Sequence, residues 1–380
     1  MSIKNKITKS SFYCYLLIVI VFVAIRMLSE FNVLSFLGPT GKYILNAFIQ
    51  IGLLFTISVF MFKSLTKSKT KDVFSFYGYK KISWRAVLIS IAIGIVVYVL
   101  NIFVATFFNT LLSAIGYKFS SSSLPSSYPV WLLLINLFVT AFLPAVCEET
   151  AHRGMLLKSM SCAGKWKAII ISSLLFGLLH LNIEQFFYAT LIGLLLGFIT
   201  TGSDTIYPAM IIHFMNNAIS VLMGFSKVRG LGLDAMFTWI NYSAANNPVV
   251  GMIFVLCLIT LLSMLLIWLI NKLFKHTIIK NISVIQNELF KEIARKNYIK
   301  QLNDVAQGNE VNDNVPISFE EFDQMYQSKS LALGHTSEIE NKMLSDPKPY
   351  KMDGITKTLM ITAFILTAAV TIFTLIWGIL

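Results

Sequence analysis

Nine apolar stretches, each near the roughly 17–25 residues that cross a bilayer as a helix, dominate this chain of 380 residues. They lie near residues 12–30, 43–62, 84–112, 130–157, 167–182, 185–202, 206–224, 248–271 and 357–379. Charged residues make up 13% of the chain, against roughly 25% in soluble domains, and the mean hydropathy is +0.71. Because hydrocarbon leaves unpaired backbone groups unsatisfied, such stretches form helices. The sequence therefore predicts an all-α, polytopic helix bundle that crosses the cell membrane several times.

The net charge is +12, and the basic residues are concentrated in alternate loops. Lysines precede the first span, and seven basic residues lie between the second and third, whereas the alternate loops hold only one or two each. Positive residues mark the cytoplasmic side, so we expect a cytoplasmic N-terminus and, after nine spans, a C-terminus outside. This pattern favours anionic membrane lipids as partners over nucleic acid.

Composition predicts four parts. Residues 1–118 supply spans one to three, 119–271 supply spans four to eight, 272–356 form a cytoplasmic segment, and 357–380 hold the last span. Apolar residues at helical spacing in 272–302 predict an amphipathic helix that continues span eight or lies on the membrane surface. The polar stretch 303–349 predicts a segment with little order of its own.

The fourth, fifth and seventh spans carry side chains that are costly in a bilayer, at about 2.5–3.5 kcal/mol for each ionised group. They are Glu148, Glu149, Arg153, His180, His213 and Asn217. At about 1.5 Å per residue, four of them lie roughly 13–20 Å from the expected cytoplasmic ends of their spans, namely Glu148, His180, His213 and Asn217. We therefore expect them to share one layer inside the membrane.

Such a layer suits hydrolysis of a peptide bond. A buried carboxylate can act as a general base, a nearby histidine can share the proton, and an amide can donate to an oxyanion. The same groups could instead hold zinc, but the local His-Glu-x-x-His pattern is absent, so we expect no cofactor and keep zinc as the alternative. We expect Cys147 to be a packing residue and His152 to lie near the interface.

Three ordered motifs resemble a known family. They are Glu148-Glu149-x-x-x-Arg153, Phe176-x-x-x-His180 and His213-x-x-x-Asn217. Their order and spacing over about residues 130–225 resemble the CPBP family of CAAX-type II prenyl endopeptidases and Abi proteases, which process bacteriocins or act in bacteriocin immunity. The resemblance implies an eight-span protease core with its site reached from the cytoplasm, to which the ninth span is an addition.

By this resemblance, Glu148 and His180 activate water, while His213 and Asn217 stabilise the oxyanion. The remaining motif residues, Glu149 and Arg153, support them. We therefore expect a glutamate-type, alternatively metal-dependent, intramembrane endopeptidase acting on a peptide or membrane protein. The alternative is a non-proteolytic scaffold of the same family that binds a partner enzyme or sensor kinase through 272–380.

Overall fold

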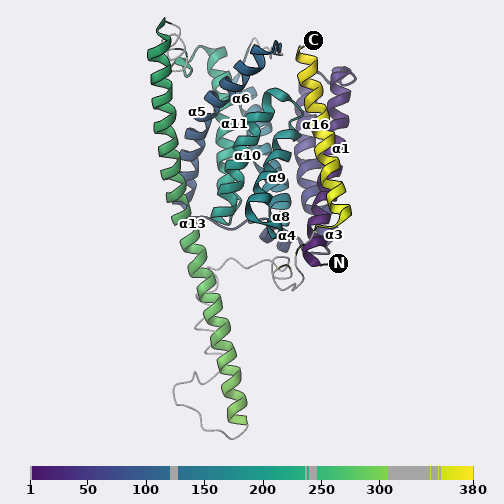
Figure 1. The fold of residues 1–380 in the computed structure, drawn as a ribbon, viewed down its shortest axis with the longest axis vertical. Coiled ribbons are helices and arrows are strands. Elements are labelled where there is room, and N and C mark those ends of the chain that lie inside the picture. The colour runs from purple at the N-terminus through teal and green to yellow at the C-terminus, as the bar shows by residue number, and fades with distance from the viewer. Residues whose placement is uncertain are drawn as a thin grey trace.

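The computed structural model describes residues 2–119, 127–235, 238, 246–306, 343, 350 and 352–379, and within these ranges it contains helices and connections but no strand. Figure 1 shows the helices standing side by side in one bundle. Eight of them are long and apolar enough to cross a membrane: Ile3–Glu30, Thr40–Thr66, Trp84–Ala114, Val130–Ala163, Ile183–Ser203, Tyr207–Arg229, Pro248–Thr277 and Gly354–Ile379. The predicted all-α, multi-pass membrane bundle is confirmed.

The stretch expected to be the fifth span differs from the other eight. Helix α9 covers Lys165–Leu179, which is 15 residues or about 22 Å, less than the roughly 30 Å of a hydrocarbon core. It ends because Leu181 adopts a left-handed conformation with φ of 51°, after which α10 (Ile183–Ser203) turns back. A Cβ on Gly177 would lie 2.0 Å from Oγ1 of Thr190, so this glycine lets α9 and α10 pack closely.

The two chain ends lie at opposite ends of the bundle (Figure 1). Helix α1 (Ile3–Glu30) rises from the end that holds the N-terminus, and α16 (Gly354–Ile379) finishes at the other end. Helix α13 (Pro248–Ala306) has 59 residues and extends far beyond the bundle on the N-terminal side. The predicted helix in 272–302 thus continues the eighth predicted span, whereas most of 303–349 lies outside the described residues.

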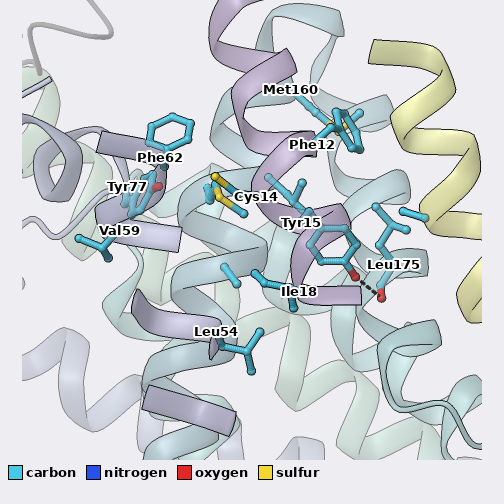
Figure 2. Packing of buried hydrophobic residues seen from close by; sticks show 14 of the residues in the cluster. Phe12, Cys14, Tyr15, Ile18, Leu54, Val59, Phe62, Tyr77, Met160 and Leu175 are labelled. Atoms are coloured by element: carbon cyan, nitrogen blue, oxygen red, sulfur yellow. Dashed lines mark hydrogen bonds between the residues drawn. The ribbon is translucent and has the colours of Figure 1, made fainter. Parts of the chain in front are cut away.

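The largest apolar cluster lies around α1. Figure 2 shows Phe12, Tyr15 and Ile18 of this helix buried together with Leu175 of α9. The Tyr15 hydroxyl donates to the Leu175 carbonyl at 2.9 Å, which satisfies a polar group that would be costly to bury alone. This core fixes α9 against α1.

Helix α16, the predicted ninth span, packs against α1, α9 and α10. Near its end, the Thr374 hydroxyl accepts a hydrogen bond from the backbone N–H of Ile183 at 3.1 Å. The Gly378 carbonyl accepts another from the N–H of Lys118 at 2.7 Å. The added span therefore contacts the α9–α10 turn directly.

At the N-terminal end of the bundle, Asp204 joins three segments. Its carboxylate lies 2.5 Å from Nζ of Lys80, which precedes α5 (Trp84–Ala114), and 2.8 Å from Nζ of Lys158. Burial alone would raise the pKa of Asp204, but Lys158 and Lys80 together lower it below its usual value. The ion pairs tie the turn before α11 (Tyr207–Arg229) to its neighbours.

Two spans contain π-helical segments, which are wider than α-helix and recur at functional sites. In the second span, α2 (Gly38–Phe48) is followed by η2 (Ile49–Phe55), η3 (Ile57–Met61) and α3 (Phe62–Thr66). The fourth runs through α6 (Val130–Asn136), η4 (Leu137–Phe142), α7 (Leu143–Glu149), η5 (Thr150–Leu157) and α8 (Lys158–Met160). The short helix α4 (Thr70–Phe76) lies between the second and third spans.

Candidate active site

The centre of the site is a buried charge cluster. Glu149, at the end of α7, and Arg153, one turn later, are both fully buried and meet at 3.0 Å. His213 of α11 is 5% exposed, and its Nδ1 lies 2.9 Å from the same Oε1 atom of Glu149. The i,i+4 spacing explains the first contact, and packing of α11 on α7 supplies the second. Three predicted site residues are thus in direct contact.

Arg153 has two further contacts. Its Nη2 donates to the Gly193 carbonyl of α10 at 3.1 Å, and its guanidinium lies 4.3 Å from the centre of the Phe176 ring. The other Glu149 oxygen, Oε2, and Arg153 Nε are buried without a hydrogen-bond partner among the described residues. The pair is therefore desolvated and held from several helices at once.

Glu148 is only partly buried, unlike Glu149. Its Oε1 accepts a hydrogen bond of 2.9 Å from Nε2 of Gln50 in η2. Gln50 is 5% exposed, and its own Oε1 has no partner in the described part of the chain. Sequence reasoning missed Gln50, although an amide within the apolar run of the second span is an available signal.

His180 lies directly after α9 and is partly buried. Its Nδ1 is 3.0 Å from the Phe176 carbonyl, so Nδ1 carries the proton and Nε2 is left as an acceptor. No hydrogen bond between Glu148 and His180 occurs in the described structure. His180 also lines a cavity of about 440 Å³, together with residues from the second half of α1, the α1–α2 connection and the start of the second span.

His152 was expected near the interface, and that prediction is wrong. The ring is fully buried, and its Nδ1 lies 2.9 Å from the Glu148 carbonyl. It makes edge contacts with Tyr15 at 5.5 Å and with Phe176 at 5.1 Å between ring centres. The reason is that the fourth span runs on to Ala163, which places His152 well inside it.

Phe176 is the hydrophobic centre of the site. Besides His152, its ring makes edge contacts with His180 at 5.2 Å and with His213 at 5.7 Å. Three histidines from three spans or turns therefore surround one ring. The motif histidines lie close together because each packs against the Phe176 ring. The sequence alone does not reveal that packing.

Asn217 lies one turn after His213 on α11 and faces the fourth span. Its Nδ2 donates to the Thr140 carbonyl at 3.3 Å. In a regular helix that carbonyl would accept from residue 144, but Pro144 has no N–H. Asn216 Nδ2 donates to Asn217 Oδ1 at 3.1 Å, which fixes the orientation of the Asn217 amide.

The donor set does not suit a dication. In the described ranges, no group of three His, Cys, Asp or Glu side chains is arranged to hold a metal ion. The two candidate ligands that do meet, Glu149 and His213, share their oxygen with the Arg153 cation, which would repel a metal. Whether the protein works without a cofactor stays a prediction.

Comparison with known proteins agrees with the motifs. Residues 129–219 match the family model described as type II CAAX prenyl endopeptidase Rce1-like. No curated protein and no solved structure matches the chain. The matched segment contains the motif residues from Glu148 to Asn217 and does not bear on the bacteriocin-related branch. This match confirms the predicted CPBP resemblance over residues 129–219, and at the family level it supports a CAAX-type intramembrane protease.

Proposed function

We propose that this protein is a CPBP-type intramembrane endopeptidase in which Glu148 activates the attacking water. The observation that carries this proposal is the difference between the paired carboxylates. Glu149 is fully buried and bound by Arg153 and His213, whereas Glu148 is partly exposed and held through one oxygen by Gln50. The second Glu148 oxygen is thus available to a water molecule.

The histidine at the end of α9 suits the same water. Because Nδ1 of His180 donates to the Phe176 carbonyl, Nε2 can accept a proton or a hydrogen bond. The Gln50 amide holds the Glu148 carboxylate in place, since its Nε2 donates to Oε1. A positioned general base typically contributes about 10²–10⁴-fold to a rate.

Hydrolysis then follows ordinary acyl chemistry. Glu148 takes a proton as the water oxygen bonds to the peptide carbonyl carbon, and the carbonyl oxygen gains the negative charge. As an imidazolium, His213 donates Nδ1–H to the Glu149 carboxylate and Nε2–H to that oxyanion. Asn217 donates through the second hydrogen of its amide. The proton passes from Glu148 to the leaving nitrogen as the C–N bond breaks.

The positioning roles go to the buried pair. Glu149 orients the His213 ring by accepting from Nδ1, while Arg153 anchors Glu149 to α10 through the Gly193 carbonyl. With a cytoplasmic N-terminus, as the loop charges favour, the C-terminus lies outside. Lipids surround the bundle, and the substrate is a peptide or membrane protein.

A double-mutant experiment tests this mechanism. Glu148→Gln and His180→Ala should each abolish the biological activity while the protein accumulates normally, because an uncharged side chain is easier to bury. The double variant should be little worse than either single variant, because residues that act as one unit are not additive. Asp234→Asn, in the connection after α11, is the matched control and should be active.

A scaffold is the second candidate, and α13 is the observation that favours it. This helix is about 88 Å long and extends well past the bundle, where it can carry a partner (Figure 1). A scaffold would keep its phenotype in Glu148→Gln and His180→Ala. Full activity of Glu148→Gln at wild-type abundance would therefore exclude the protease and favour the scaffold.

A further inference from the structure

A second cavity, separate from the motif residues, lies at the end of the bundle that holds the N-terminus. Its volume is about 310 Å³, and its walls come from the start of α1, the end of α4, the end of the fourth span and the stretch before α16. None of the six motif residues is among the described residues that line it. Figure 1 shows the N-terminus, α4 and α8 together at this end. The cavity therefore lies where the expected spans meet the headgroup region of a bilayer.

The cavity has an excess of positive charge. Lys4 and Lys158 line it, and none of the described residues in its wall is acidic. Lys158 contacts Asp204 at 2.8 Å, but that carboxylate also lies 2.5 Å from Lys80, so it offsets only one of the two lysines. An ammonium group has three donor hydrogens, so Lys158 has donors beyond the one that Asp204 accepts. The wall thus favours an anionic ligand that accepts hydrogen bonds.

The hydroxyl of Tyr350 is a further donor at this cavity. It is buried, and although Thr8 lies nearby, it makes no hydrogen bond of normal geometry among the described residues. The Thr8 hydroxyl already donates to the Lys4 and Ser159 carbonyls, at 3.0 and 2.8 Å. Burial raises the pKa of Tyr350 to about 12, so the hydroxyl keeps its proton near neutral pH. Because buried donors are normally paired, an acceptor atom on a ligand would satisfy this hydroxyl.

One side of the cavity wall is apolar. Phe76 and Met343 are almost fully buried and belong to the largest apolar cluster of the bundle. A space of about 310 Å³ holds a phosphate group together with the carbon atoms attached to it. Cationic donors on one side and apolar side chains on the other therefore suit a phosphate ester.

We propose that this cavity binds a phosphate group, with Lys4, Lys158 and the Tyr350 hydroxyl donating to its oxygens. Hydrogen bonds from charged donors to phosphate are short and strong. An anionic phospholipid headgroup and free phosphate share this chemistry, and the position at the end of the spans favours the lipid. The site is separate from the proposed catalytic residues and does not depend on proteolysis.

The phosphate site gives a function to the stretch before the ninth predicted span. Tyr350 lies outside residues 129–219, the part of the chain that matches the family model. Lys158 begins α8, which continues the helical span that carries Glu148 and Glu149. A bound phosphate therefore links the start of α1, the end of the fourth span and the approach to α16.

Protection of Cys162 tests the site directly, because this partly buried thiol lines the cavity. Cys257, which is exposed, is replaced by alanine, so that the other two cysteines are the buried Cys14 and Cys147. The purified protein is placed in nanodiscs of phosphatidylcholine, with or without phosphatidylglycerol, and its rate of reaction with uncharged N-ethylmaleimide is measured. We expect phosphatidylglycerol to slow the reaction of Cys162 at least fivefold. In a third sample, protection by inorganic phosphate in phosphatidylcholine alone would assign the site to free phosphate.

Two variants make the result specific. Lys4→Gln combined with Tyr350→Phe removes two of the proposed donors and should abolish the protection. Lys71→Gln changes an exposed lysine of α4 at the same end of the bundle and should keep the protection, which separates the site from a general effect of an anionic surface. Equal rates in all three samples, or equal protection in the Lys4→Gln/Tyr350→Phe variant, would overturn the proposal.

Thermal unfolding provides a second readout that does not use a thiol. A ligand that binds only the folded protein raises the unfolding temperature as its concentration increases. Phosphatidylglycerol added to the protein in detergent should raise the midpoint for the wild type and for Lys71→Gln, and by less than half as much for Lys4→Gln/Tyr350→Phe. The midpoint of this double variant without phosphatidylglycerol shows whether it is folded. An equal rise in a folded double variant would show that the assigned donors do not bind the phosphate.

Discussion

The buried Glu149–Arg153 pair allows a quantitative prediction about stability. Both side chains are fully buried, and they meet at 3.0 Å. Removing one partner of such a pair leaves an uncompensated charge and costs about 3–5 kcal/mol. Arg153→Met should therefore lower the free energy of unfolding by that amount, even though methionine fills much of the same space.

The double variant should recover much of this loss. Glu149→Leu with Arg153→Met removes both charges, and apolar replacement of a buried pair is often neutral or even stabilising by about 1–4 kcal/mol. His213 loses its Nδ1 partner in this variant, so we expect stability without activity. That outcome would separate the structural role of the pair from its role in orienting His213.

The assay is a double-mutant cycle on protein purified in detergent. Each variant is unfolded by titration with a denaturing detergent, and the free energies of unfolding are compared. The matched control is Arg26→Met, because Arg26 and Glu30 form a partly exposed i,i+4 pair that is worth about 0–1 kcal/mol. If Arg153→Met unfolds at the same denaturant concentration as the wild type, the pair does not stabilise the fold and the reasoning fails.

Three further changes have defined outcomes. Gln50→Leu removes a hydrogen bond to a charged group that is worth about 1.5–3 kcal/mol. The activity that depends on Glu148 should therefore fall at least tenfold at unchanged abundance. Unchanged activity would exclude a role for Gln50. The pKa of Asp204 is lowered because its lysine partners outweigh burial, so its stabilisation is present above about pH 4 and is lost as the pH falls through the lower folded value. Asp204→Asn should therefore be less stable at pH 7 and approach the wild type in acid, as thermal unfolding across pH would show. Thr374→Val leaves the Ile183 N–H without its acceptor and should lower stability by about 1 kcal/mol, whereas Thr358→Val, at an exposed site on the same helix, should not.

Much of the site followed from the sequence because its chemistry lies in local spacing. Glu149 and Arg153 are four residues apart, as are His213 and Asn217, and each pair projects from one side of its helix. Hydropathy located the spans, and the cost of burying charge indicated that the polar residues would meet. The contact between Glu149 and His213 confirms that the fourth and seventh spans share a layer.

The rest depended on tertiary packing. Gln50 is a single amide without a spacing partner, so nothing local pointed to its bond with Glu148. The apolar run around α9 looked span-length, but the chain turns at Leu181, whose left-handed backbone is imposed by its buried surroundings. Hydropathy identified α16 as a span but could not indicate which helices it contacts. In the structure it packs against the turn after His180.

The most direct test of the central claim is a comparison of newly formed peptide N-termini in membranes from cells with wild-type protein and with Glu148→Gln at equal abundance. Hydrolysis by Glu148-activated water predicts a small set of N-termini that are present with the wild type, absent with Glu148→Gln and present with the Asp234→Asn control. Identical sets of N-termini in all three samples, with a wild-type phenotype for Glu148→Gln, would contradict the account.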